Sequence, residues 1–187
     1  MELSKEFKID EETYVEFCVK TANSRNYATV SITSLFIVAM SAILKFSSDL
    51  LSSILFGLVY GAIYIAIVLI FSKITTKKAA QKAYLKRGID KYEMSVLFNS
   101  EGISQKFGED QETKIEWERF KKILETSIAY YFYINASQAI LVSKKFLDGG
   151  EQSLLKKIIV ENATPKCKVK FLKDDTITQK DDLNDLK

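Results

Sequence analysis

The sequence contains no histidine, and only two of its 187 residues are cysteines. Without histidine the chain lacks the commonest metal ligand and the usual general base at neutral pH, which argues against most enzyme classes. Cys18 and Cys167 are far apart and imply no disulfide framework, so we expect both to be reduced thiols on cytoplasmic segments. The net charge of +3 is too small to indicate a nucleic-acid partner.

Recognisable catalytic and cofactor motifs are also lacking. The chain has no phosphate-binding glycine loop, no nucleophile elbow and no Cys or His pair with metal-ligand spacing. Glu116 and Glu118 flank Trp117 with strand spacing, and we interpret them as solvated surface residues, not as a catalytic pair. We therefore predict no catalytic residue, no cofactor and no metal, and we expect a protein that is not an enzyme.

Two long uncharged stretches dominate the first half of the chain. Residues 28–44 read ATVSITSLFIVAMSAIL, and a snorkelling Lys45 followed by Phe46 can extend this stretch to 28–46. Residues 50–71 read LLSSILFGLVYGAIYIAIVLIF, which as a helix spans roughly 33 Å, the thickness of a bilayer core. The break between them is too short for a domain, so the sequence predicts an antiparallel transmembrane hairpin over residues 28–71.

Two rival interpretations of these stretches fail. A cleaved signal peptide is disfavoured because twenty-seven mostly polar residues of mixed charge precede the first stretch. A buried hairpin in a soluble protein is disfavoured because soluble core helices rarely stay uncharged for twenty-two residues. We therefore expect membrane lipids to surround both helices.

Basic residues lie before and after the predicted hairpin in the sequence, at the ends that would share one side of the membrane. Lys20 and Arg25 precede it, and only Lys45 lies in the break. Six basic residues follow it: Lys73, Lys77, Lys78, Lys82, Lys86 and Arg87. By the positive-inside rule we predict a multi-pass cell-membrane protein with both termini in the cytoplasm. The six residues would face the anionic inner leaflet, and specific recognition of anionic lipid stays an alternative to simple anchoring.

Small residues recur every four positions in the second stretch, at Ser53, Gly57 and Gly61. This spacing places them on one helix face, where another helix can approach closely. The face can pack against the first stretch or mediate homo-oligomerisation. We interpret Tyr60 and Tyr64 as packing residues whose hydroxyls bond to the neighbouring helix.

The remaining segments are predicted from their periodicity. Residues 1–27 should hold a short helix capped by Asp10, which packs on the C-terminal domain or lies at the membrane surface. Residues 72–92 should form a basic juxtamembrane helix that stops near Gly88. Residues 93–172 alternate as six strands in an antiparallel meander, followed by a helix that Asp148 and Glu151 cap and by a short strand near Val169. Residues 173–187 are polar, and we expect them to be disordered.

Three stretches resemble the YcxB-like family of bacterial membrane proteins: FNSEGI at 98–103, IEWERFKKILET at 115–126 and AILVSKKF at 139–146. The order of segments along nearly the whole chain is similar to that family as well. The resemblance implies a C-terminal domain similar to a pleckstrin-homology (PH) sheet with a closing helix. It implies no reaction, ligand or catalytic residue. Phosphoinositide binding is not expected, because the first strand turn carries the acidic Glu101 where phosphate would need Lys or Arg.

The predicted protein is thus an α+β membrane protein that consists of a transmembrane hairpin and a cytoplasmic PH-like domain. We expect it to be a tethered interaction module that presents a strand edge or groove to a protein partner or to another copy of itself. A small membrane enzyme or an accessory subunit of a transport complex is the first alternative. A sensor of anionic lipid or of membrane state is the second.

Overall fold

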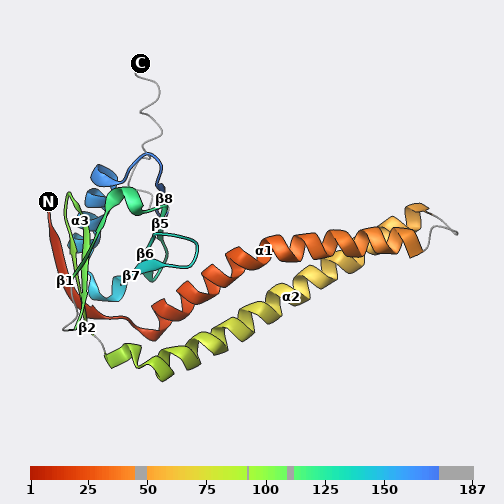
Figure 1. Cartoon of the computed structure of the whole chain (residues 1–187), viewed down its shortest axis with the longest axis horizontal. Coiled ribbons are helices and arrows are strands. Elements are labelled where there is room, and N and C mark those ends of the chain that lie inside the picture. Colours follow the sequence, from red (N-terminus) through yellow and green to blue (C-terminus); the bar gives the residue numbers. More distant parts are fainter. Residues whose placement is uncertain (45–49, 92, 109–111, 173–187) are drawn as a thin grey trace, which may run out of the picture. The chain divides into compact units, whose positions relative to one another are not determined.

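The computed structural model describes residues 1–44, 50–91, 93–108 and 112–172, and some helical side chains are also outside this description. The chain divides into two units (Figure 1). The helical unit comprises Lys8–Glu93. The β unit comprises Met1–Phe7 together with the described residues from Met94 onward.

The helical unit consists of two long helices that contact each other, α1 (Glu11–Leu44) and α2 (Leu50–Arg87) (Figure 1). The Asp10 carboxylate caps α1, since its Oδ1 accepts a hydrogen bond from the Thr13 backbone N–H at 3.0 Å. The cap is where the sequence predicts it, but the expected short helix is not separate. It continues without a break into the first apolar stretch.

Helix α2 likewise joins the second apolar stretch and the basic segment into one helix. It ends at Arg87, and Gly88 follows with a φ of +61°, a left-handed conformation that favours glycine. The short 3-10 helix η1 (Ile89–Lys91) then leads toward the β unit. The residues of the predicted break, 45–49, lie outside the described residues.

The first sheet of the β unit has the strand order β1-β2-β3-β4. Its strands are β1 (Leu3–Lys8), β2 (Glu93–Phe98), β3 (Gly102–Phe107) and β4 (Thr113–Glu116). Strands β2, β3 and β4 pair antiparallel, as predicted. Strand β1 was not predicted, because only its buried Leu3 and Phe7 are strongly apolar in a run of charged residues.

The second sheet has the strand order β7-β6-β5-β8. Its strands are β5 (Lys122–Glu125), β6 (Ala129–Tyr133), β7 (Ala139–Ser143) and β8 (Lys168–Lys170). The six predicted strands are present, but the prediction of a single sheet is wrong, because they are divided between two sheets. The short strand expected near Val169 is β8, and it pairs with β5 in parallel, so the domain is not purely antiparallel.

The division falls at the 3-10 helix η2 (Trp117–Arg119). The alternation of residues 113–117 predicted that Trp117 would continue β4, but the strand ends at Glu116. Instead, the Trp117 indole N–H donates a hydrogen bond to the Asn99 carbonyl at 2.9 Å. The Trp117 ring is tilted against the Phe120 ring, and the two ring centres lie 5.9 Å apart. The chain turns here because the turn places this large ring in the core between the two sheets.

Aromatic side chains connect the two sheets in one core. The Phe132 ring of β6 lies 5.5 Å from the Phe98 ring of β2 and 6.0 Å from Phe120. Every residue of β6 is buried. Burial of each large side chain contributes about 1.5–3 kcal/mol, so this aromatic centre is a main source of the unit's stability.

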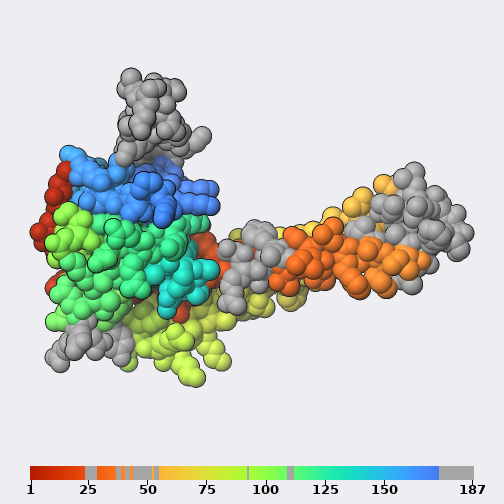
Figure 2. Space-filling view, turned by 45° about the horizontal axis from the view of Figure 1, so that its top comes forward, coloured from red at the N-terminus to blue at the C-terminus, as the bar shows by residue number. Residues whose placement is uncertain are grey.

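Helix α3 (Gly149–Asn162) completes the β unit. Its start is a capping box between Asp148 and Glu151, as predicted. Leu155, Ile158 and Ile159 on its apolar face are fully buried. Figure 2 shows this helix and the segment after it, in blue, against the strands of the same unit. The C-terminal helix therefore covers the core, as expected.

Candidate membrane-anchoring site

The strongest membrane signal lies in α2. Residues Leu55–Arg87 form a helix long and apolar enough to cross a bilayer, and its large apolar side chains are exposed. Leu58 is 54% exposed, Ile67 54% and Phe71 67%. Soluble monomers rarely expose apolar patches beyond roughly 300–600 Å². Helix α2 is therefore a candidate membrane span.

The evidence for a second span in α1 is weaker. Among the residues that the structure describes, one helix qualifies as a candidate span, not the two that the sequence predicts. Hydroxyl residues interrupt this stretch, although the Thr33 hydroxyl is satisfied by a 2.9 Å hydrogen bond to the Thr29 carbonyl. Side chains at 24–28, 37, 38, 41, 42 and 44 also lie outside the description. Five described large apolar side chains of this stretch are nevertheless exposed, namely Ile32, Leu35, Phe36, Met40 and Ile43, whereas Val30 is buried.

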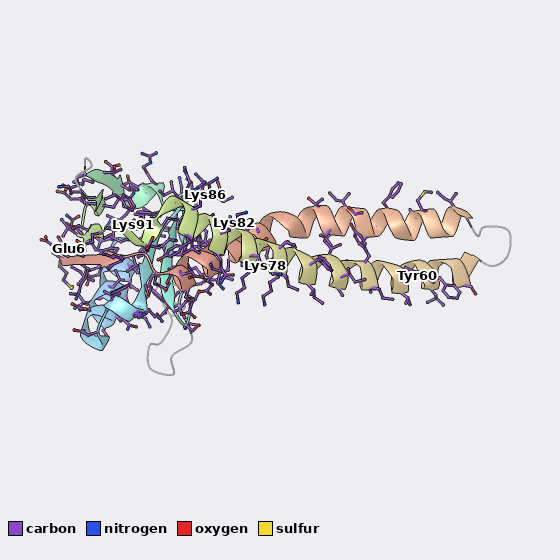
Figure 3. The ribbon with its side chains drawn as sticks, turned by 90° about the horizontal axis from the view of Figure 1, so that it is seen from below. Glu6, Tyr60, Lys78, Lys82, Lys86 and Lys91 are labelled. Carbon is purple, nitrogen blue, oxygen red and sulfur yellow. The ribbon has the colours of Figure 1, made fainter. Side chains whose placement is uncertain are left out.

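The small-residue face of α2 is partly described. Gly57 and Gly61 are buried within the single chain, and the Ser53 side chain lies outside the described residues. This burial fits packing of the glycines against α1. The interpretation of Tyr60 as a packing residue is wrong, because its side chain is 62% exposed on the outer face of α2 (Figure 3).

Six exposed basic residues follow the apolar part of α2, and we call them the basic collar: Lys73, Lys77, Lys78, Lys82, Lys86 and Arg87. Lys78, Lys82 and Lys86 lie four residues apart, so they share one face of the helix (Figure 3). At 1.5 Å per residue the collar extends along roughly 21 Å of helix. Its first members would lie at the headgroups of a bilayer that surrounds the apolar part, and its last members farther into the aqueous phase.

Hydrogen bonds and a ring contact join the polar ends of α1 and α2, and the sequence did not predict them. The Tyr84 hydroxyl donates a hydrogen bond to the Ile9 carbonyl at 2.8 Å, and the Gln81 amide donates to the Glu11 carboxylate at 2.9 Å. The rings of Tyr14 and Tyr84 lie 5.8 Å apart. These contacts join residues about seventy positions apart, for which a single sequence carries no signal.

Cys18 lies beside this junction and is half-buried. Burial raises the pKa of its thiol, although a hydrogen bond with Tyr14 acts in the opposite direction. A raised pKa leaves the thiol protonated and poorly nucleophilic at neutral pH. The prediction of a reduced thiol is consistent with this environment, and Cys18 shows no feature of a reactive cysteine.

A buried ion-pair cluster lies in the β unit. The Glu125 Oε1 lies 2.5 Å from the Lys144 Nζ and 3.1 Å from the Lys156 Nζ. Burial alone would raise the pKa of Glu125, but the hydrogen bonds from the two lysines outweigh it and hold the pKa below its usual value. Both lysine side chains therefore point toward Glu125 and not into solvent.

The acidic residues around Trp117 line a shallow open cavity of about 470 Å³. Its lining residues are Ser100, Glu101, Lys114, Glu116, Trp117, Glu118, Asn162 and Thr164. Lys114 is already paired with Glu101. Among the described residues no group of three or more potential ligands could hold a metal ion, and the acidic tail after position 172 lies outside the description. This cavity presents charge, but no converging catalytic arrangement.

Comparison with known proteins supports the resemblance in the β unit. The family described as YcxB-like protein matches residues 98–159, which include all three stretches that carry the resemblance. The match covers less than half of the chain and none of the helical unit. No curated protein and no solved structure matches the chain.

Proposed function

We propose that this chain, with its YcxB-like segment, is a membrane-anchored interaction module without enzymatic activity. In this proposal α1 and α2 cross the cell membrane as a hairpin, and both termini lie in the cytoplasm. The β unit is PH-like and presents its surface to a protein partner.

The observation that carries the proposal is that exposed apolar side chains along α2 are followed directly by exposed basic side chains. Large apolar side chains stay exposed from Leu55 to Ile74, and the exposed basic collar begins in the same turn. Water would penalise each fully exposed side chain by about 1.5–3 kcal/mol relative to burial, whereas lipid would not. Lysine and arginine next to a span favour the cytoplasmic side.

The hairpin arrangement follows from the connection between the helices. Only residues 45–49 separate α1 from α2, so a chain that crosses the bilayer in α2 must either return through α1 or hold α1 along its surface. The contact between α1 and α2 and the burial of Gly57 and Gly61 support the return.

An interaction role is favoured over catalysis because carboxylates of the β unit form ion pairs with neighbouring lysines. The buried Glu125 is paired with two lysines, and Glu101 is paired with Lys114, so these carboxylates take part in ion pairs within the β unit. The β unit also has a closing helix, as the resemblance to a PH-like domain implies, and exposed strand edges can bind extended segments of partner proteins.

Two experiments test this proposal. Membranes from cells that express the full chain are washed with alkaline carbonate, and we expect the protein to remain in the pellet; its release would refute the anchor. Purification from detergent-solubilised membranes should then retain a stoichiometric protein partner. Recovery of a small molecule or a metal in place of a protein would refute the interaction role.

Recognition of anionic lipid is a second candidate, favoured by the exposure of all six collar residues. Each basic residue near the surface contributes about 1 kcal/mol of attraction to an anionic leaflet. The full chain in nanodiscs with and without anionic lipid should differ in the protection of α2 amides after Ile74. Equal protection in both nanodiscs would exclude this role.

A further inference from the structure

We propose that the outer edge of β5 is a docking site for an extended peptide segment, and that the chain's own β8 occupies this site in the structure. We call this edge the β5 edge. The inference rests on the proposed interaction role, and it names the site and the class of ligand.

Strand β8 is attached to the β5 edge by few contacts. The two strands pair in parallel over three residue pairs, from Lys122 with Lys168 to Leu124 with Lys170. One further backbone hydrogen bond runs from the Lys168 N–H to the Lys121 carbonyl at 3.1 Å. Parallel pairing is slightly less stable per residue than antiparallel pairing, and β8 is the last strand of its sheet. Its release would break these pairings but leave the pairing of β5 with β6 and of β6 with β7 intact.

Strand β5 keeps its main stabilising ion pairs when β8 is absent. Glu125 ends β5, and both of its lysine partners come from other elements, Lys144 from η3 (Lys144–Phe146) and Lys156 from α3. A buried carboxylate that loses its partners is strongly destabilising, but this one keeps both when β8 leaves. Only the hydrogen bond from the Leu172 N–H to Glu125 Oε2, at 3.1 Å, is lost.

The contacts of β8 define what the site accepts. Cys167 is buried, Val169 and Phe171 are half-buried, and the residues between them are exposed. The Lys156 Nζ lies 5.8 Å from the centre of the Phe171 ring, a cation–π contact. Backbone hydrogen bonds of an added strand supply affinity, and alternate side chains supply selectivity. The ligand class is therefore an extended segment that carries a small apolar, a β-branched and an aromatic residue at alternate positions.

The opposite edge of the same sheet is unsuited to this role. Strand β7 forms that edge, and four of its five residues are buried, from Ile140 to Ser143. In contrast, Lys168 and Lys170 of β8 are exposed. The edge of this sheet that becomes accessible when β8 is released is therefore the β5 edge.

The test uses the full chain in nanodiscs and a labelled synthetic peptide of residues 165–172, PKCKVKFL. A Val169→Asp/Phe171→Ser protein weakens its own β8, and a Lys170→Ala protein is the matched control, because this exposed side chain does not face the sheet. We expect the peptide to bind the double variant at least about tenfold more tightly than the wild type, because a site blocked part of the time has a proportionally lower apparent affinity. The control should bind like the wild type, and a peptide with the Asp and Ser changes should not bind.

Equal peptide affinity for the wild type and a folded double variant would overturn the proposal. If the double variant does not fold, hydrogen exchange of the wild-type chain decides. Amides of β8 should then exchange at least about a hundredfold faster than those of β6, since local opening is easiest at the weakest element. Equal rates would refute a removable strand. Release of the protein by carbonate would refute the membrane anchor and leave these peptide results unaffected.

Discussion

Replacing Glu125 by glutamine should destabilise the β unit by about 3 kcal/mol, because it removes one charge from a buried cluster and leaves two lysines uncompensated. The Glu125 side chain is 1% exposed, and the side chains of Lys144 and Lys156 are 15% and 12% exposed. Removal of one partner of a buried ion pair costs about 3–5 kcal/mol. We use the lower value because both lysines retain some access to water.

The pH dependence provides an independent check on the same residue. The pKa of Glu125 in the folded protein lies below its usual value of 4.5, so the folded state binds this proton less readily than the unfolded chain does. Its contribution to stability is therefore complete above the unfolded pKa and is lost as the pH falls through the folded pKa. The stability difference between the wild type and Glu125→Gln should be constant near neutral pH and should shrink below about pH 4.5.

The single tryptophan makes this measurement direct. Trp117 is the only tryptophan of the chain and is 4% exposed in the β unit, so its fluorescence in urea reports the unfolding of that unit in nanodiscs. Glu118→Gln is the matched control, since Glu118 is exposed, and it should change the free energy of unfolding by less than about 0.5 kcal/mol. If Glu125→Gln is no more destabilising than this control, the ion-pair cluster does not stabilise the β unit as argued.

Three further predictions concern the helices and the first sheet. Gly61→Leu should cost about 1–3 kcal/mol in the free energy of unfolding measured by circular dichroism in mixed detergent, because Gly61 is buried, whereas Leu at the exposed Ala62 should cost little. Gly102→Ala should lower the thermal midpoint of the β unit, since a Cβ there would lie 2.3 Å from the Ile115 carbonyl oxygen, whereas Gly149→Ala meets no atom within 4 Å and should not lower it. Replacement of the whole basic collar by glutamine should give mixed orientations of a C-terminal tag in protease protection, whereas replacement of the β8 lysines should not. A uniform orientation without the collar would contradict the topology argument.

Local patterns in the sequence predicted much of the fold. The Asp10 cap, the end of α2 before Gly88, the six strands from Glu93 to Ser143 and the capping box at Asp148 are each encoded within a few residues. The length of its uncharged run also predicted that the second apolar stretch is a candidate membrane span.

Features that depend on distant contacts were missed or were wrong. Strand β1 forms only because β2 pairs with it, and nothing in its own residues marks it as a strand. The division into two sheets depends on Trp117, whose indole bonds to a carbonyl eighteen residues away. The inward orientation of Lys144 and Lys156 depends on Glu125 of another element. A single sequence shows which residues are charged, but not which of them meet.

The proposed topology has two membrane crossings and both ends in the cytoplasm, and labelling of a single cysteine tests this proposal. In the proposed topology a Ser48→Cys variant would carry a thiol on the outer side of the membrane, and intact cells are treated with a membrane-impermeant maleimide. We expect the variant to be labelled in intact cells, while the wild type, with Cys18 and Cys167 alone, is not labelled from outside. Labelling of the variant only after the cells are permeabilised would contradict the account.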